Sequence, residues 1–203
     1  MPAPPALCTI PLTCKWLYED EEGSTLPNVP LIPEDEASEE LRGLYDEARQ
    51  LLGFLPDLVL AQGAKPELLR LMLTTLRTYM APGTLSPDLK EQLGLVVSAA
   101  NSNSYCIRAH LEILHKLGVE LDLGKQIVRD FESAPVEENV KALFRFADKL
   151  TRAPFEVKEA DTAELRKHGW DDVAILETTQ VVSHFNYLNR LAAGLGVIPE
   201  EAF

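Results

Sequence analysis

Along most of the chain, apolar residues recur at intervals of three and four, and this spacing constrains the fold more than any other feature. Leu41, Leu44, Ala48 and Leu51 show it first, and it returns within residues 68–76. Such a spacing places the apolar side chains on one face of an α-helix. No segment shows the sustained alternation of apolar and polar residues that is typical of β-strands. The sequence therefore predicts an all-α fold.

Start and stop signals divide this pattern into about seven to nine helices. Ser86 is a good N-cap and Pro87 suits the first helical position, so they mark one start. Gly118 marks a stop, because glycine readily adopts the left-handed conformation that ends helices. After a first helix that carries Leu41 to Leu52, the expected helices are 57–62, one from Pro66, one from Pro87 to about residue 100, 104–117, 121–132, 136–152, 159–168 and 170–194.

The first 34 residues differ from the rest in their content of proline. Half of the 14 prolines lie within residues 1–34, and proline lacks the amide donor that a helix interior needs. We expect residues 1–34 to form an extended arm that lies over the body or over a neighbouring subunit, and residues 35–203 to form one all-α domain. Trp16 and Tyr18 favour a docked arm, since aromatic side chains gain by burial. A frayed terminus is the alternative.

The charge and composition of the chain limit the kinds of partner that it can bind. The 203 residues include 19 Lys and Arg against 32 Asp and Glu, for a net charge of −13. This balance disfavours nucleic acids and anionic membrane surfaces as partners. We find neither an apolar stretch long enough to span a bilayer nor the pattern of a secretory signal. Three cysteines do not suggest a disulfide framework, so a reducing cytoplasm is the expected compartment.

The chemically informative stretch surrounds Cys106. If Asn103 caps the helix that starts at Ser104, Cys106 occupies its third position, where unpaired amides and the helix dipole favour an anion. We therefore expect the pKa of the Cys106 thiol to be lowered, which would make it a better nucleophile. His110 lies four residues later on the same helical face, and an imidazole there can accept the thiol proton.

Glu91 belongs to the preceding helix and is the third candidate. The polar turn at residues 101–104 could fold the two helices together, and Glu91 would then orient the His110 imidazole if the packing angle permits. The structural alternative is that Cys106 is a small core residue and His110 an ordinary interfacial one. No histidine or cysteine group besides Cys106 and His110 has ligand-like helical spacing, so no metal site is predicted.

These residues resemble a known family pattern. In the carboxymuconolactone decarboxylase / alkylhydroperoxidase D (AhpD-like) superfamily, a glutamate is followed by eleven residues, Cys-x-x-Cys, three residues and a histidine; Glu91, Cys106 and His110 fit the glutamate, second-cysteine and histidine positions. The segment His184–Val197 (HFNYLNRLAAGLGV) resembles the peroxidase-related branch of that superfamily. The likeness spans about residues 35–199. It implies an all-α AhpD-like domain and a homo-oligomer.

The sequence departs from this pattern at two positions. Asn103 stands where disulfide-cycling members have the first cysteine, which resolves the sulfenic acid formed on the second. Tyr105 stands where some members have an accessory histidine. Asn103 and Tyr105 therefore become possible cap or pocket residues. The resemblance implies that Cys106 would be resolved by an external thiol, or by Cys8 or Cys14 from the arm of the same or another subunit.

Three functional hypotheses follow from the residues and the resemblance. The first is a peroxidase-like antioxidant oxidoreductase that needs no cofactor, with Cys106 as nucleophile, His110 as proton shuttle and Glu91 as its support. The second is an acid–base enzyme of the decarboxylase type, acting on a small lactone or keto acid through His110 and Glu91. The third is a helical oligomer that has lost the redox cycle. For the polar group around His184 in the last helix, both structural packing and a pocket wall remain open.

Overall fold

The computed structural model describes residues 27–198, and the regular secondary structure in this part of the chain is all helical, with no strand. The prediction of an all-α fold is therefore confirmed. The expected helix ends agree with the observed ones to within about two residues. The helices are α1 (Glu39–Leu52), α2 (Asp57–Leu60), α3 (Pro66–Met80), α4 (Pro87–Ala100), α5 (Ser104–Lys116), α6 (Leu121–Asp130), α7 (Glu138–Arg152), α8 (Glu159–Lys167) and α9 (Asp172–Leu195), with short 3₁₀ turns at Phe131–Ser133 and Pro154–Glu156.

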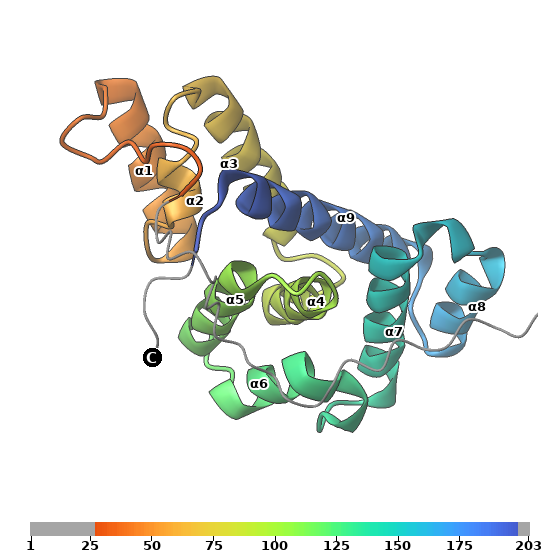
Figure 1. Cartoon of the computed structure of the whole chain (residues 1–203). Coiled ribbons are helices and arrows are strands. Elements are labelled where there is room, and N and C mark those ends of the chain that lie inside the picture. Colours follow the sequence, from red (N-terminus) through yellow and green to blue (C-terminus); the bar gives the residue numbers. More distant parts are fainter. Residues whose placement is uncertain (1–26, 199–203) are drawn as a thin grey trace, which may run out of the picture.

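Helix α4 forms the centre of the arrangement. Helices α5, α6, α7 and α9 all pack against it (Figure 1). Every residue from Leu89 to Ser98 is buried, including Lys90 and Glu91. A helix that is covered on all sides buries its polar residues along with its apolar ones. Each polar side chain of α4 therefore needs a partner inside the protein.

The loop before α4 is held by α9 and not by the capping hydrogen bond expected from Ser86. Ser86 occupies the N-cap position and Pro87 the first turn, but the Ser86 side chain makes no capping hydrogen bond. The carboxylate of Glu177 on α9 instead accepts hydrogen bonds from the amides of Thr84 and Leu85, at 3.1 and 2.9 Å. The buried Lys90 ammonium lies 3.4 Å from the same carboxylate. Contacts with α9 thus hold the loop that leads into the central helix.

The described end of the predicted arm lies against the body. The Asn28 amide donates to the Leu195 carbonyl at 2.9 Å, and the Ile32 amide donates to the Leu60 carbonyl at 3.2 Å. The Tyr45 hydroxyl donates to the Ile32 carbonyl at 2.7 Å. Residues 1–26, with Cys8 and Cys14, lie outside the described residues, so the boundary at residue 34 stays a prediction. Among the helices of residues 27–198, none is long and apolar enough to cross a bilayer.

Candidate functional site

The turn between α4 and α5 places Cys106 at the start of a helix. The Asn103 amide donates to the Ser98 carbonyl at 2.9 Å, which closes the turn. The Asn103 side-chain oxygen accepts the backbone N–H of Cys106 at 2.9 Å, so Asn103 caps α5. Asn103 stands at the position of the resolving cysteine. Its side-chain oxygen satisfies one of the free N–H groups at the helix start.

The same turn brings Glu91 of α4 to His110 of α5, a contact that the sequence leaves open. The distance between His110 Nδ1 and Glu91 Oε2 is 2.6 Å, and the two residues are only 5% and 6% exposed. A carboxylate can only accept at this contact, so Nδ1 carries the hydrogen. When the imidazole is neutral, Nε2 is then left with a lone pair that can accept a proton.

The His110 ring is also fixed by its shape. A Cβ atom on Gly94 would lie 2.4 Å from Cε1 of His110 and 2.7 Å from Nε2, so only glycine allows the ring this close to α4. On another side, Phe185 of α9 meets the ring edge to face, with 4.5 Å between ring centroids. Sequence reasoning missed Gly94. A glycine inside a helical pattern was the available signal.

Burial reverses the expected ionisation of Cys106. The residue is 6% exposed. Burial raises the pKa of the thiol to about 12, while a hydrogen bond with the Asn189 side chain opposes this rise. The prediction of a lowered pKa is therefore wrong for this structure. The start of a helix favours an anion by only about 0.3–1 kcal/mol, and removal of a thiolate from water costs more.

All three candidate residues line one cavity of about 70 Å³. Such a volume has room for a few water-sized groups, which limits what can enter without side-chain movement. Apart from Glu91, Cys106 and His110, the lining is largely apolar. It consists of Leu52, Phe54, Pro56, Leu58, Val59, Met72, Leu76, Tyr105, Ala109, Ile113, Phe185 and Leu188.

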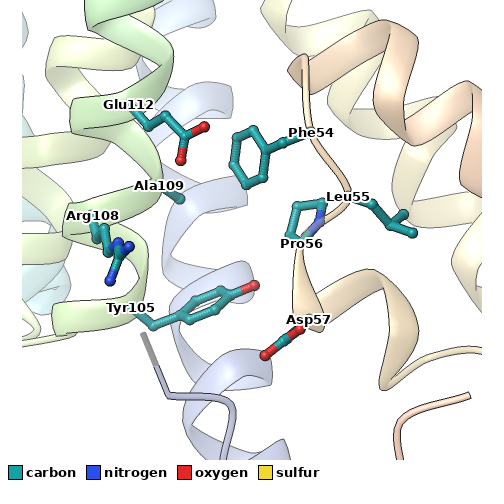
Figure 2. Close-up of a pocket in the computed structure, with 8 residues that line it drawn as sticks. All are labelled: Phe54, Leu55, Pro56, Asp57, Tyr105, Arg108, Ala109 and Glu112. Carbon is teal, nitrogen blue, oxygen red and sulfur yellow. The ribbon is translucent and has the colours of Figure 1, made fainter. Parts of the chain in front are cut away.

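A second pocket of about 100 Å³ adjoins this cavity and shares Phe54, Pro56, Tyr105 and Ala109 with it. Figure 2 shows the Tyr105 ring, from α5, facing the segment that carries Pro56 and Asp57. The Tyr105 hydroxyl accepts the backbone N–H of Leu58 at 2.9 Å. Tyr105 therefore lies in the wall between the two pockets and ties α5 to the start of α2.

No cluster of three or more potential metal ligands occurs in residues 27–198. His184 on α9 is 6% exposed and burial lowers its pKa to about 4. Its Nε2 has no hydrogen-bond partner. Tyr79 packs edge to face on the His184 ring at 5.2 Å. His184 does not line the cavity that Cys106 and His110 share.

Part of the chain matches a known protein family. Residues 66–128, which include Glu91, Asn103, Cys106 and His110, match the model of the carboxymuconolactone decarboxylase family. No curated protein matches the chain.

Solved structures show the same fold. An uncharacterized peroxidase-related protein from Silicibacter sp. TM1040 is 29% identical, with 88% of this chain and 96% of that one covered and a TM-score of 0.78. An uncharacterized peroxidase-related protein with an alkylhydroperoxidase AhpD core, from Ralstonia eutropha JMP134, is 27% identical, with 86% and 93% covered and a TM-score of 0.79. The debrominase Bmp8, solved with 2,3,4-tribromopyrrole, is 21% identical, with 87% and 93% covered and a TM-score of 0.76, and it shares the fold.

The described residues thus form an all-α domain of the AhpD class, with a cysteine and a histidine–glutamate pair on one cavity. Residues 66–128 match the carboxymuconolactone decarboxylase family model, and the fold is similar to that of AhpD-like peroxidase-related proteins. At the level of the family, this similarity supports a peroxidase-related or decarboxylase-type function.

Replacement of Gly94 tests the close approach of His110 to α4. We expect Gly94→Ala to lower the free energy of unfolding by about 1–3 kcal/mol, because the added methyl must displace the His110 ring. Urea denaturation measures this change. The matched control is Gly43→Ala in α1, where nothing lies within 4 Å. The control should be more stable than the wild type by about 0.5–1 kcal/mol. Equal stability of the two variants would contradict the contact.

The raised pKa of Cys106 predicts slow alkylation at neutral pH. With a pKa of about 12, only about one thiol in ten thousand is ionised at pH 8. We expect iodoacetamide labelling of Cys106, followed by mass spectrometry, to rise about tenfold per pH unit between about pH 7 and pH 10 without a plateau. A plateau near the free-thiol value of about 8.5 would show that burial does not control this sulfur.

Proposed function

We propose that the protein is a one-cysteine, peroxidase-related oxidoreductase that reduces a small hydroperoxide at Cys106. The observation that carries this proposal is the buried contact of 2.6 Å between His110 and Glu91, on the cavity that Cys106 also lines. The contact holds an imidazole with Nε2 available as a base. A buried neutral thiol needs such a base beside it, because burial keeps it protonated.

In the proposed reaction, the Cys106 sulfur attacks the terminal oxygen of the hydroperoxide. A bond forms between sulfur and this oxygen, and the O–O bond breaks. His110 Nε2 takes the thiol proton and delivers it to the departing alkoxide, which leaves as an alcohol. The sulfur is oxidised by two electrons to a sulfenic acid, and the hydroperoxide is reduced by two electrons. Glu91 holds the imidazole in place and stabilises its transient positive charge.

The sulfenic acid then needs a thiol from elsewhere, because Asn103 cannot supply one. We propose a small external thiol as reductant. Its sulfur forms a mixed disulfide with Cys106 and water leaves; a second thiol then releases the free Cys106 and takes away a disulfide. Cys8 or Cys14 of the same or another subunit is the alternative source. We further propose that the protein acts as a homo-oligomer in the cytoplasm, and that an exposed face of α9 forms part of the interface between subunits.

One observation favours a second candidate function. Burial raises the pKa of Cys106 to about 12, so at neutral pH the thiol is a poor nucleophile until its proton is removed. In the alternative, Cys106 only lines the cavity. His110 and Glu91 then carry out proton transfers on a small lactone or keto acid, as a decarboxylase-type enzyme would.

Stopped-flow measurement of hydroperoxide consumption tests the first proposal. The assay uses tert-butyl hydroperoxide with dithiothreitol as the external thiol. We expect Cys106→Ser to reduce the rate to background, because the nucleophile is lost. His110→Ala should slow consumption by about 10²–10⁴-fold, the usual contribution of a general base.

The matched control for this assay is His115→Ala, an exposed histidine on the same helix, which should leave the rate within about twofold. Background rates in both the wild type and Cys106→Ser would overturn the peroxidase proposal. Turnover of a lactone that survives Cys106→Ser but not His110→Ala would establish the alternative.

A further inference from the structure

Five polar side chains from α4, α9 and the turn before α5 form a connected network beside Cys106. Asn189 of α9 is at its centre and is 2% exposed. Its side-chain N–H donates to Ser98 Oγ at 3.1 Å, and its side-chain oxygen accepts from Asn101 Nδ2 at 3.2 Å. Asn101 Nδ2 also donates to Asn186 Oδ1 at 3.1 Å. The backbone carbonyl of Asn189 accepts from Asn103 Nδ2 at 3.0 Å, so Asn189 also holds the cap of α5.

The orientation of this network is fixed at its outer end. The Arg190 guanidinium, which can only donate, lies 2.7 Å from Asn186 Oδ1. The carbonyl of Val182, which can only accept, lies 3.0 Å from Asn186 Nδ2. The Asn186 amide can therefore adopt one orientation only, with its oxygen toward Arg190 and Asn101.

The orientation of Asn186 in turn fixes the orientation of Asn189. Because Asn186 presents its oxygen, Asn101 must present its NH₂ group to it. That NH₂ group also faces Asn189, which must therefore present its oxygen to Asn101. The NH₂ group of Asn189 is then turned the other way, where one of its two hydrogens is used by Ser98.

Asn189 has a second amide hydrogen available, and its side chain forms a hydrogen bond with the Cys106 thiol. We propose that Asn189 is a positioning residue that donates a hydrogen bond to this sulfur, with its orientation set through Asn101 and Asn186 by Arg190. This inference rests on the proposed function, in which Cys106 reacts. An N–H donor favours a thiolate over a thiol, and it lowers the Cys106 pKa against the effect of burial.

The hydrogen bond has a consequence for the reaction. Transfer of the thiol proton to His110 places negative charge on sulfur before the bond to oxygen is complete. A fixed donor inside an apolar cavity stabilises that charge without having to reorient. Asn189 of α9 thereby compensates in part for the desolvation of Cys106. His110, on α5 with Cys106, provides the base.

Replacement of the donor tests the proposal through the ionisation of Cys106, independently of peroxidase activity. The full chain is alkylated with iodoacetamide over a range of pH, and labelling of Cys106 is followed by mass spectrometry. Asn189→Asp keeps the shape but replaces the donor with an acceptor. We expect labelling at a given pH to be at least about tenfold slower than in the wild type, since a hydrogen bond to a charged group changes a pKa by about one unit or more.

A second variant covers the case in which Asn189→Asp does not fold. Asn101→Ala removes the donor that fixes the Asn189 amide, at a partly exposed position, and should slow labelling about two- to fivefold. The control is Thr178→Val, a buried position on α9 whose hydroxyl bonds to the Ala174 carbonyl of its own helix at 2.7 Å. It should leave the pH profile of Cys106 unchanged.

Two results would overturn the inference. One is a wild-type pH profile in the Asn101→Ala variant together with a wild-type profile in any folded Asn189→Asp protein. The other is an equal slowing in Thr178→Val, which would show that general loosening of α9 is the cause. If wild-type protein fails to consume peroxide and the Asn189 effect is present, the proposed function fails and the positioning role stands.

Discussion

The buried contact between Glu91 and His110 is the interaction on which the candidate site depends. Helix α4 is covered on all sides, so Glu91 lies inside the protein, where a carboxylate without a partner would be costly. His110 provides the partner at 2.6 Å. The same contact fixes the imidazole beside the cavity that Cys106 lines. One hydrogen bond therefore gives the buried Glu91 carboxylate a partner and holds the His110 imidazole at the cavity that Cys106 lines.

The surroundings of Cys106 have two opposing effects on the ionisation of its thiol. The small, largely apolar cavity restricts the site to small groups, and burial keeps the thiol protonated. The Asn189 amide opposes this effect of burial, and in the proposed reaction His110 accepts the thiol proton. In that reaction an unreactive resting thiol is ionised only when a substrate is present. This balance suits a cysteine that has no resolving partner at position 103, since a resting thiolate would be open to further oxidation.

Local signals were sufficient to predict the helices, because apolar spacing, Pro87 and the Asn103 cap act within a few residues. The spacing of Cys106 and His110 likewise predicted a shared helical face. The ionisation of Cys106 was predicted wrongly, since burial depends on how α3, α5 and α9 pack. The contact with Glu91 depended on a packing angle that no local pattern contains. The Asn189 network joins helices almost ninety residues apart in sequence, so only the fold reveals its orientation.

Proton NMR of protein with isotopically labelled histidine nitrogens tests the central contact most directly. We expect His110 to carry its hydrogen on Nδ1 in a strong hydrogen bond, with a proton signal far downfield that is assigned by its loss in His110→Ala. In Glu91→Gln this signal should move upfield, because a neutral acceptor forms a weaker bond than a carboxylate. A neutral His110 with its hydrogen on Nε2, or a signal that Glu91→Gln leaves unchanged, would contradict the account.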